Sequence, residues 1–429
     1  MNNPVERHRP HHRVLSPSWR SVLIGACVCV LTLCVGAPTL AAPQEMPVKV
    51  GFILPDSGPL AAEARSLQAG FDLFLKEKRP ERVKFQLIRK DIGPEEDRVV
   101  ESMTDLVFNE KVEFLIGPLG VEASEKAIHG VAGVTTIMFV LNPAVRLVGG
   151  ELCRPGTFRV GVTTYQSAQP LGSWFMKHVG PKVLVTGNDE SICNEQADFF
   201  AFHFERAGGT FADRIMVQGD DPKEIDAILD AIRQIKPSGV FAAFRGKKAV
   251  AFLKAFRNAS PPIECPVVGP AQLTAFPEVL TAAGESGAGV KTLAYLNDPV
   301  KLLSRIKTSL GRDVSDVARV AEGYDIAAVI TDALSRRKAD KFEHSEILQL
   351  MKEAEVEGCR GKLRFDKNHE PVLNGLLQEW AFKAGEWQHQ VIESIGECRS
   401  PDFGCGRVGF PVTPGKETFQ EPDLLDEGE

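Results

Sequence analysis

The feature that most constrains the fold of this 429-residue chain is a regular alternation of strand-like and helix-like segments. It begins with the apolar, β-branched run VKVGFIL at residues 48–54. AAEARSLQAGFDLFLKE follows, with apolar residues at helical spacing. The two kinds of segment then alternate as far as TTIMFVLN at residues 135–142. Helical segments of this length between strands predict parallel βαβ units, with helices on both faces of the sheet.

A second series of the same kind follows GTFRVGV. Its members alternate between strands and helices: KVLVTGN (182–188), NEQADFFAFHFERAG (ending at Gly208), TFADRIMVQ, 222–235, GVFAAF, 247–258 and CPVVGP. The sequence therefore predicts an α/β protein with two doubly wound units, near residues 46–162 and 163–292. Because ligands bind beyond the carboxyl ends of the strands in such sheets, we expect both sets of loops to surround one cleft.

Later segments extend this pattern. AEGYDIAAVITDALSRRK at 321–338 predicts another amphipathic helix, and KLRFDKNHE predicts a strand that runs into a turn. From about Cys398 the chain becomes irregular and acidic, ending in KETFQEPDLLDEGE. This composition predicts a disordered tail at 398–429.

The N-terminus has the three parts of a secretory signal peptide. RHRPHHRVLSPSWR is basic, SVLIGACVCVLTLCVGA has no charge, and PTLAAPQ supplies small residues, with Thr39 and Ala41 at the −3 and −1 positions. We expect residues 1–42 to be removed and the mature protein to be exported to the periplasm. An uncleaved anchor is the alternative, although the apolar run is short for a span of ~20 residues. IGAC, ending at Cys27, resembles a lipoprotein cleavage motif only weakly.

The composition narrows the classes of function. With 43% hydrophobic and 25% charged residues, the chain is typical of a soluble globular protein. A formal charge of −7 argues against a nucleic-acid partner. The sequence lacks G-x-S-x-G, HExxH, a Walker loop and a G-x-G-x-x-G after a strand, so we expect no enzyme. It has no CxxC pair, and HRPHH at 8–12 precedes the signal core, so we expect no metal and no cofactor.

Six cysteines follow the signal segment: Cys153, Cys193, Cys265, Cys359, Cys398 and Cys405. An even number in an exported protein permits disulfide bonds. Cys398 and Cys405 lie close together in a stretch that contains Gly and Pro, and we predict a local bridge between them.

The segment FLIGPLGVEASEKA, at residues 114–127, has the pattern of a loop that can bind an anion. A strand that stops at Gly117 and a helix that starts near Val121 aim several free backbone N–H groups at one spot. Such a spot suits an anion, and we expect it to face a bound acid. A tight turn that binds nothing is the alternative.

KVGFILPDSGPLAAEARSLQAGFDLFLKE resembles the opening of type I periplasmic binding proteins of the branched-chain amino-acid (Leu/Ile/Val-binding) group. Further motifs follow in that family's order: VEFLIGPLG, NPAV, FRV, the Gly208–Gly209 pair, GVFAAF, VVGP, EGYDIAAVITDAL and GCRGKLRFDKN. The resemblance covers about residues 47–392.

This resemblance implies two Rossmann-like lobes with parallel sheets, joined by three hinge crossings, that close on a solute. Lobe 1 would comprise 46–162 and 293–367. Lobe 2 would comprise 163–292 and 368–397, with the last strand near LLQEWAF. The expected partners are a small solute and the permease subunits of an ABC transporter, with the protein itself a monomer. A periplasmic sensor of the same fold that signals to a membrane partner is the alternative, with an exported enzyme a distant third.

The family's ligand contacts can be carried over position by position. A hydroxyl residue of amino-acid binders corresponds to Val121, a second hydroxyl to Arg146, a tyrosine to Cys193, an acidic residue to Ala271 and an aromatic residue to Arg245. The predicted ligand contacts are Ser57, Gly120, Val121, Asn142, Ala144, Arg146, Thr164, Cys193, Arg245 and Ala271.

Together, these replacements favour one class of ligand. Without the acidic residue, an α-ammonium group loses its partner, whereas the guanidinium groups of Arg146 and Arg245 match a carboxylate. We therefore expect a ligand that bears a carboxylate and lacks an α-amino group, such as an aromatic or aliphatic acid. A true amino-acid binder with a divergent site is the alternative.

Each of these positions also has a structural interpretation. Arg146 can pair with a surface carboxylate such as Glu151, and Arg245 can start a solvated helix. Ser57 can cap a helix, and Cys193 can be buried or disulfide-bonded. The other structural roles are the closing of the turn before Pro143 by Asn142, and packing and capping by Tyr324 and Asp325.

Overall fold

The computed structural model describes residues 45–80, 83–144, 148, 152–274, 279, 284–339, 341–383 and 386–401. The predicted signal peptide, Arg146, Cys405 and the tail from residue 402 onward lie outside these ranges. Within them, no helix is both long and apolar enough to cross a membrane.

The first sheet has five parallel strands in the order β2-β1-β3-β4-β5. Its strands are β1 (Met46–Leu54), β2 (Val83–Asp91), β3 (Phe114–Ile116), β4 (Ile137–Val140) and β5 (Thr157–Arg159). The intervening helical elements are α2 (Ala61–Lys78), α3 (Val99–Thr104), η2 (Asp105–Glu110) and α4 (Val121–Gly130). The predicted alternation in this part of the chain is confirmed.

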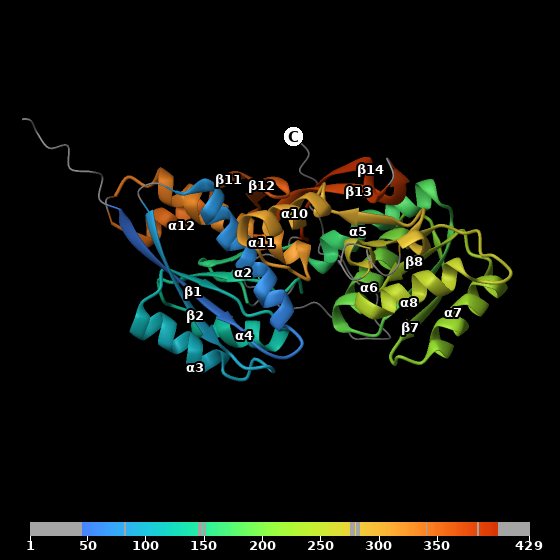
Figure 1. The fold of residues 1–429 in the computed structure, drawn as a ribbon, viewed down its shortest axis with the longest axis horizontal. Helices are drawn as coiled ribbons and strands as arrows, with labels where there is room; N and C mark the ends of the chain where they lie inside the picture. The colour runs from blue at the N-terminus through green and yellow to red at the C-terminus, as the bar shows by residue number, and fades with distance from the viewer. Residues whose placement is uncertain are drawn as a thin grey trace, which may run out of the picture. The chain divides into compact units, whose positions relative to one another are not determined.

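Both faces of the first sheet are covered, as expected of a doubly wound sheet. Alternate residues of β1 point to opposite faces. Phe52 packs edge-on against Phe71 of α2, while Ile53 joins a separate apolar cluster with α3, η2 and α4. Figure 1 shows α2 and α11 on one side of β1 and β2, and α3 and α4 on the other.

The second sheet has nine strands, ordered β11-β12-β13-β10-β9-β8-β6-β7, with β14 paired to β13. The strands from β6 to β10 are parallel. β13 pairs antiparallel with β10, β12 and β14, and β11 pairs antiparallel with β12. The strands are β6 (Lys182–Asn188), β7 (Thr210–Val217), β8 (Gly239–Ala243), β9 (Val267–Pro270), β10 (Lys291–Ala294), β11 (Glu355–Gly358), β12 (Gly361–Phe365), β13 (Pro371–Lys383) and β14 (Glu386–Cys398).

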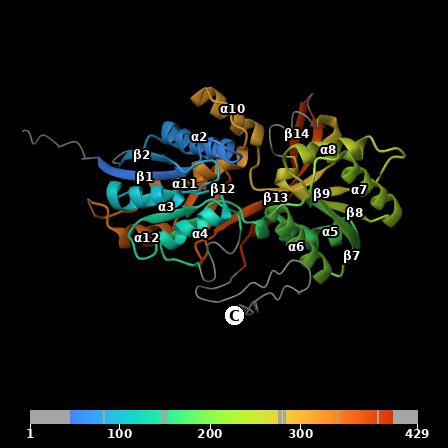
Figure 2. The ribbon, with the colours of Figure 1, turned by 90° about the horizontal axis from the view of Figure 1, so that it is seen from below.

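Helices again cover both faces. They are α5 (Thr164–His178), α6 (Ser191–Arg206), α7 (Pro222–Ile235) and α8 (Gly246–Arg257), with short 3-10 turns η4 (Ala271–Leu273) and η5 (Gly284–Gly287). Phe200 of α6 stacks on Phe241 of β8, whereas Val240 of β8 packs with α7 and α8 in another cluster. Figure 2 shows these two pairs of helices around β8 and β9.

After β10 the chain returns to the first sheet. Three helices follow: α10 (Pro299–Leu310), α11 (Val317–Arg336) and α12 (His344–Lys352). Tyr324 of α11 packs edge-on against Phe74 of α2, and Arg305 of α10 pairs with Glu77 of α2 at 2.6 Å. The chain then crosses back through β12 and the long β13. The residue boundaries of the two lobes stay a prediction.

Two predictions for the C-terminal region are wrong. The strand containing LLQEWAF, β13, is followed by β14, which pairs along it. Cys398 is a free, buried thiol, so it forms no bridge with Cys405. Among the described cysteines, Cys193, Cys265 and Cys359 are also free, and Cys153 is disulfide-bonded.

Candidate functional site

A cavity of about 200 Å³ lies among elements of both sheets. Pockets for drug-sized ligands usually measure ~300–1,000 Å³, so this one suits a small solute. It is lined by Glu63, Pro143, Gly161, Val162, Thr163, Thr164, Ser167, Ile192, Gln196, Arg245, Pro270, Ala271, Gln272, Leu293, Ala294, Tyr295, Leu296, Pro299, Asp316, Val317, Ala318, Arg319, Ala321, Glu322, Arg360 and Gln378.

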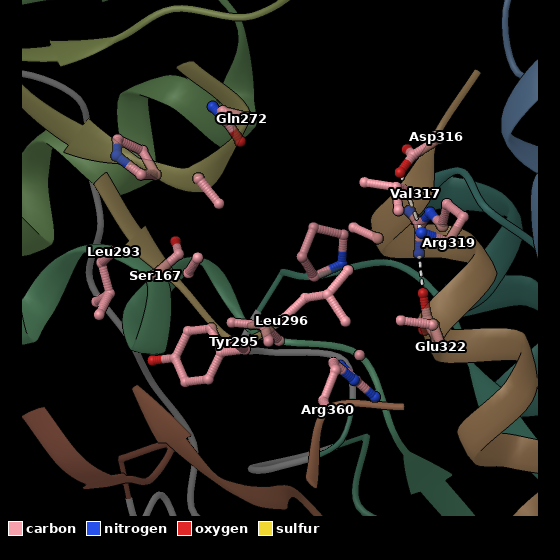
Figure 3. A pocket seen from close by; sticks show the side chains of 18 of the residues that line it. Ser167, Gln272, Leu293, Tyr295, Leu296, Asp316, Val317, Arg319, Glu322 and Arg360 are labelled. Carbon is pink, nitrogen blue, oxygen red and sulfur yellow. Dashed lines mark hydrogen bonds and ion pairs between the residues drawn. The ribbon is translucent and has the colours of Figure 1, made fainter. Parts of the chain in front are cut away.

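The start of α11 forms a charged wall (Figure 3). Asp316 is the N-cap residue, and its carboxylate accepts a hydrogen bond from the backbone N–H of Arg319 at 3.0 Å. One turn of helix brings the Arg319 guanidinium next to Glu322, with 2.6 Å between Nη1 and Oε2. Arg319 also donates to the Leu141 carbonyl at 2.7 Å. These contacts fix the guanidinium at the cavity wall.

Glu63, in the first turn of α2, connects this wall to the second sheet. Its Oε1 lies 2.8 Å from Nη2 of Arg245, the N-cap residue of α8, and its Oε2 lies 3.3 Å from Nε of Arg319. Burial alone would raise the pKa of Glu63, but the charges of Arg319 and Arg245 lower it below its ordinary value. Glu63 is therefore ionised at neutral pH.

The pKa of Asp316 is shifted in the opposite direction. Asp316 is 6% exposed. Burial, reinforced by the negative charge of Glu63, raises its pKa to about 6 despite the nearby Arg319 and Arg245. The proton occupancy of Asp316 thus changes close to neutral pH.

Arg360 forms a further part of the wall. Its Nε lies 2.7 Å from Oδ2 of Asp325, and its Nη2 donates to the Val160 carbonyl at 2.8 Å. The other carboxylate oxygen of Asp325 accepts from the backbone N–H of Cys359. Asp325 has no exposed surface, so it holds Arg360 from behind. Its predicted structural role agrees with these contacts.

The opposite wall, on the second sheet, is neutral and polar. Figure 3 shows Ser167 and Gln272 across the cavity from Asp316, Arg319 and Glu322. Gln196 donates to the hydroxyl of Ser167 at 2.8 Å and accepts from Gln272 at the same distance. Amide and hydroxyl groups of this kind can donate to or accept from a ligand without carrying charge.

Apolar side chains form much of the remaining surface: Val162, Ile192, Leu293, Leu296, Pro299 and Val317. The hydroxyl of Tyr295 is engaged outside the cavity, because it donates to the Gln166 carbonyl at 2.7 Å. An apolar body with one or two polar groups fits such a lining.

Three of the predicted contact residues line the cavity: Thr164, Arg245 and Ala271. Thr164 begins α5 and donates to Glu195 at 2.7 Å. Arg245 follows β8, and Ala271 follows β9, so both lie at the carboxyl ends of strands, where the sequence placed the cleft. Arg245 is not a freely solvated helix start, because it pairs with Glu63.

The remaining described candidates do not line the cavity. Ser57 is exposed, and it does not cap α2, whose N-cap residue is Leu60. Asn142 closes its turn by accepting from the Ala144 N–H and donating to the Leu119 carbonyl. Cys193 is a buried thiol, whose pKa burial raises to about 12. Arg146 lies outside the described residues.

The GPLG loop binds an anion from the chain itself. The backbone N–H groups of Leu119 and Gly120 donate to the two carboxylate oxygens of Glu96, at 2.9 and 2.6 Å. Val121 begins α4 and packs against its apolar cluster. The prediction that these N–H groups hold a bound acid is therefore wrong, since the side chain of Glu96 already occupies them.

Sequence reasoning missed Glu63, Asp316, Arg319, Glu322 and Arg360. A signal was present for some of them. Asp316 precedes an apolar helical stretch, as N-cap residues do, and Arg319 and Glu322 are charged residues three apart in that same stretch. Nothing local indicated that this helix face would meet the second sheet.

Comparisons with known proteins agree with this architecture. Residues 47–386 match the family described as periplasmic binding protein. The Leu/Ile/Val-binding protein homolog 6 of Brucella melitensis is 24% identical over 367 residues, which cover 82% of this chain and 93% of that protein.

Two solved structures extend the comparison. The solute-binding protein of an ABC transporter from R. palustris, in complex with benzoate, has a TM-score of 0.68 and 21% identity, covering 83% of this chain and 99% of that one. A leucine-binding protein from Thermotoga maritima has a TM-score of 0.64 and 19% identity, covering 81% and 99%. At these identities the likeness shows the fold.

Proposed function

This chain belongs to the periplasmic binding protein family and has its type I α/β fold, and from that membership we propose that it is the solute-binding component of an ABC-type importer. It would hold a small solute in the cavity and deliver it to permease subunits in the membrane. The family is one of binding proteins, which agrees with the expectation that the chain is not an enzyme. A periplasmic location follows from the same proposal.

We further propose that the solute bears a carboxylate and lacks an α-amino group. The observation that carries this proposal is the presence of Arg245 and Arg319 on the cavity wall, one beside each sheet. Guanidinium groups bind carboxylates through paired hydrogen bonds. Ala271, which stands where amino-acid binders have an acidic residue, also lines the cavity.

The apolar part of the lining supports an aromatic or branched aliphatic body. The benzoate complex of the R. palustris protein supports an aromatic acid, and the leucine-binding protein supports a branched aliphatic body. A benzene ring and a branched aliphatic chain are both small enough for a cavity of this size.

A second candidate, an amino acid bound in a divergent site, is favoured by one observation. Three carboxylates line the cavity, from Glu63, Asp316 and Glu322. Oε1 of Glu322 is buried and makes no hydrogen bond within the described structure. A buried carboxylate oxygen of this kind is a good acceptor for an ammonium group.

The two candidates differ in a direct binding test. Isothermal titration calorimetry measures the affinities for three acids, namely benzoate, 4-hydroxybenzoate and isovalerate. They are compared with the affinities for leucine and isoleucine. We expect the acids to bind and the amino acids to fail. Binding of leucine without binding of any acid would contradict the carboxylate proposal and support the second candidate.

A variant links the binding to the site. Arg245→Gln should weaken acid binding by about 100-fold, because one charged partner is lost from a desolvated pair. Arg305→Gln is the matched control, since Arg305 also pairs with a glutamate of α2, at 2.6 Å, but does not line the cavity. Equal affinities for both variants would exclude Arg245 from the ligand site.

A further inference from the structure

The carboxylate of Glu63 stands where a ligand carboxylate would be expected. It is shared between two guanidinium groups, from Arg245 beside the second sheet and Arg319 on α11. The side chain of Glu63 is 15% exposed and lines the cavity. Both arginines that favour an acidic ligand are thus already in contact with an acid of the chain.

The side chains that line the cavity carry equal numbers of positive and negative charges before any ligand enters. Among the described lining residues, three are cationic and three are anionic: Arg245, Arg319 and Arg360 against Glu63, Asp316 and Glu322. Arg360 is in addition paired with the fully buried Asp325. A carboxylate that simply added to this group would bring an uncompensated negative charge into a desolvated site, which is strongly unfavourable.

The two arginines belong to different parts of the protein. Arg319 contacts Glu322 and the Leu141 carbonyl as well as Glu63, all within the part of the protein built on the first sheet. Arg245 contacts Glu63 from the second sheet. Exchange of partners at Arg245 therefore leaves Glu63 paired with Arg319, within the part built on the first sheet.

We propose that Glu63 is a built-in competitor for the ligand site, and that a bound carboxylate replaces Glu63 on Arg245 while Glu63 stays with Arg319. This inference rests on the proposed function. It makes Glu63 a specificity-determining residue. A solute must bring both a carboxylate and an apolar body that fills the lining, because the carboxylate alone only replaces a contact that already exists.

The test is the affinity of the Glu63→Gln variant for benzoate, measured by isothermal titration calorimetry on the full exported chain. Glutamine keeps the size of the side chain and removes its negative charge. We expect the variant to bind benzoate roughly tenfold or more tightly than the wild type, because the competing anion and its repulsion are gone. Benzamide, which has no charge, should gain no affinity.

Glu77→Gln is the matched control. Glu77 lies on the same helix, pairs with Arg305 at 2.6 Å and does not line the cavity. Its replacement should leave benzoate affinity unchanged. A similar gain in both variants would mean that net charge alone is responsible, and would overturn the proposal.

The outcomes separate this inference from the proposed function. If the wild type binds benzoate and Glu63→Gln binds it equally or more weakly, Glu63 is no competitor, and the carboxylate proposal stands. If neither protein binds benzoate, 4-hydroxybenzoate or isovalerate, both ideas fail. If the variant does not fold, a crystal structure of the wild type with benzoate decides, since a Glu63–Arg245 hydrogen bond that persists beside the ligand overturns the inference.

Discussion

Arg159 of β5 and Glu370, in the turn before β13, form an ion pair in the protein interior, with 3.0 Å between Nη1 and Oε1. Arg159 has no exposed surface, and Glu370 is 3% exposed. The guanidinium also donates to the Ala144 carbonyl at 2.7 Å. The pair thus joins the last strand of the first sheet to the segment that leads into β13 of the second.

Stability should depend on the protonation of Glu370. Burial raises its pKa from 4.5 to about 7, although Arg159 acts in the opposite direction. Because the folded-state pKa is raised, the contribution of this group is fully present below pH ~4.5 and is lost as pH rises through about 7, by on the order of 3 kcal/mol. The free energy of unfolding of Glu370→Gln, relative to that of the wild type, should therefore increase as pH rises from 5 to 7.5, as measured by urea unfolding.

An exposed ion pair is the control, because the pKa of its glutamate shifts in the opposite direction. Glu397 pairs with Arg364 at 2.6 Å, and the Arg364 hydrogen bond lowers its pKa. Glu397→Gln should lose at most ~1 kcal/mol near neutral pH, and the loss should vanish as pH falls below the ordinary pKa of a glutamate. Parallel pH profiles for the wild type and Glu370→Gln would contradict the first prediction.

Acid binding should become stronger as pH falls toward 5.5. Asp316, with a pKa of about 6, lines the cavity and is faced by Glu63 of α2, Arg245 of α8, and Arg319 of its own helix. Its protonation removes one negative charge from the site, while a carboxylic ligand, with a pKa near that of Glu, stays ionised. We expect benzoate affinity to rise several-fold between pH 7.5 and 5.5.

Asp316→Asn isolates this effect. Asparagine is as good an N-cap residue as aspartate, so α11 should remain intact, as circular dichroism can verify. The variant should bind benzoate more tightly than the wild type at pH 7.5 and show little change with pH. A pH dependence as steep as that of the wild type would assign the titration to another group.

Close approach of α2 and α11 requires glycine at two positions. A Cβ added to Gly70 would lie 1.9 Å from the Val320 carbonyl oxygen, and one added to Gly323 would lie 2.0 Å from that of Leu67. Backbone cannot yield as a flexible side chain can. Gly70→Ala and Gly323→Ala should each destabilise the protein by about 3 kcal/mol or more.

Gly130→Ala, at the end of α4, is the control. Its added Cβ would meet only the Met103 side chain, whose terminal methyl can move. We expect a cost of less than ~1 kcal/mol in thermal or urea unfolding. Similar losses of stability in Gly70→Ala and Gly130→Ala would show that the close approach of α2 and α11 is not the reason for glycine at position 70.

The order of the elements was predictable because period-2 and period-3.6 patterns are local properties of the chain. The predicted strand at 182–188 coincides with β6, and the predicted helix at 222–235 coincides with α7. The long pairing of β13 with β14 was not predictable in the same way. Each strand of that pair depends on a partner for its hydrogen bonds rather than on its own pattern.

The candidate site was predictable only where strand ends define it. Ala271 directly follows β9, and Arg245 lies just beyond the end of β8, after Phe244, so the rule for the carboxyl ends of strands locates both at the cavity. Glu63 and Arg319 come from helices, and their approach to the second sheet depends on how α2 and α11 pack together. No spacing within either helix encodes that contact.

The GPLG loop contains both kinds of information. The end of a strand at a Gly-Pro break, and free N–H groups gathered at the start of the next helix, were predictable because both follow from local backbone geometry. The identity of the anion depends on the tertiary fold. Folding brings the carboxylate of Glu96, remote in the chain, to Leu119 and Gly120. Partner choice depends on distances in space, which the sequence does not state.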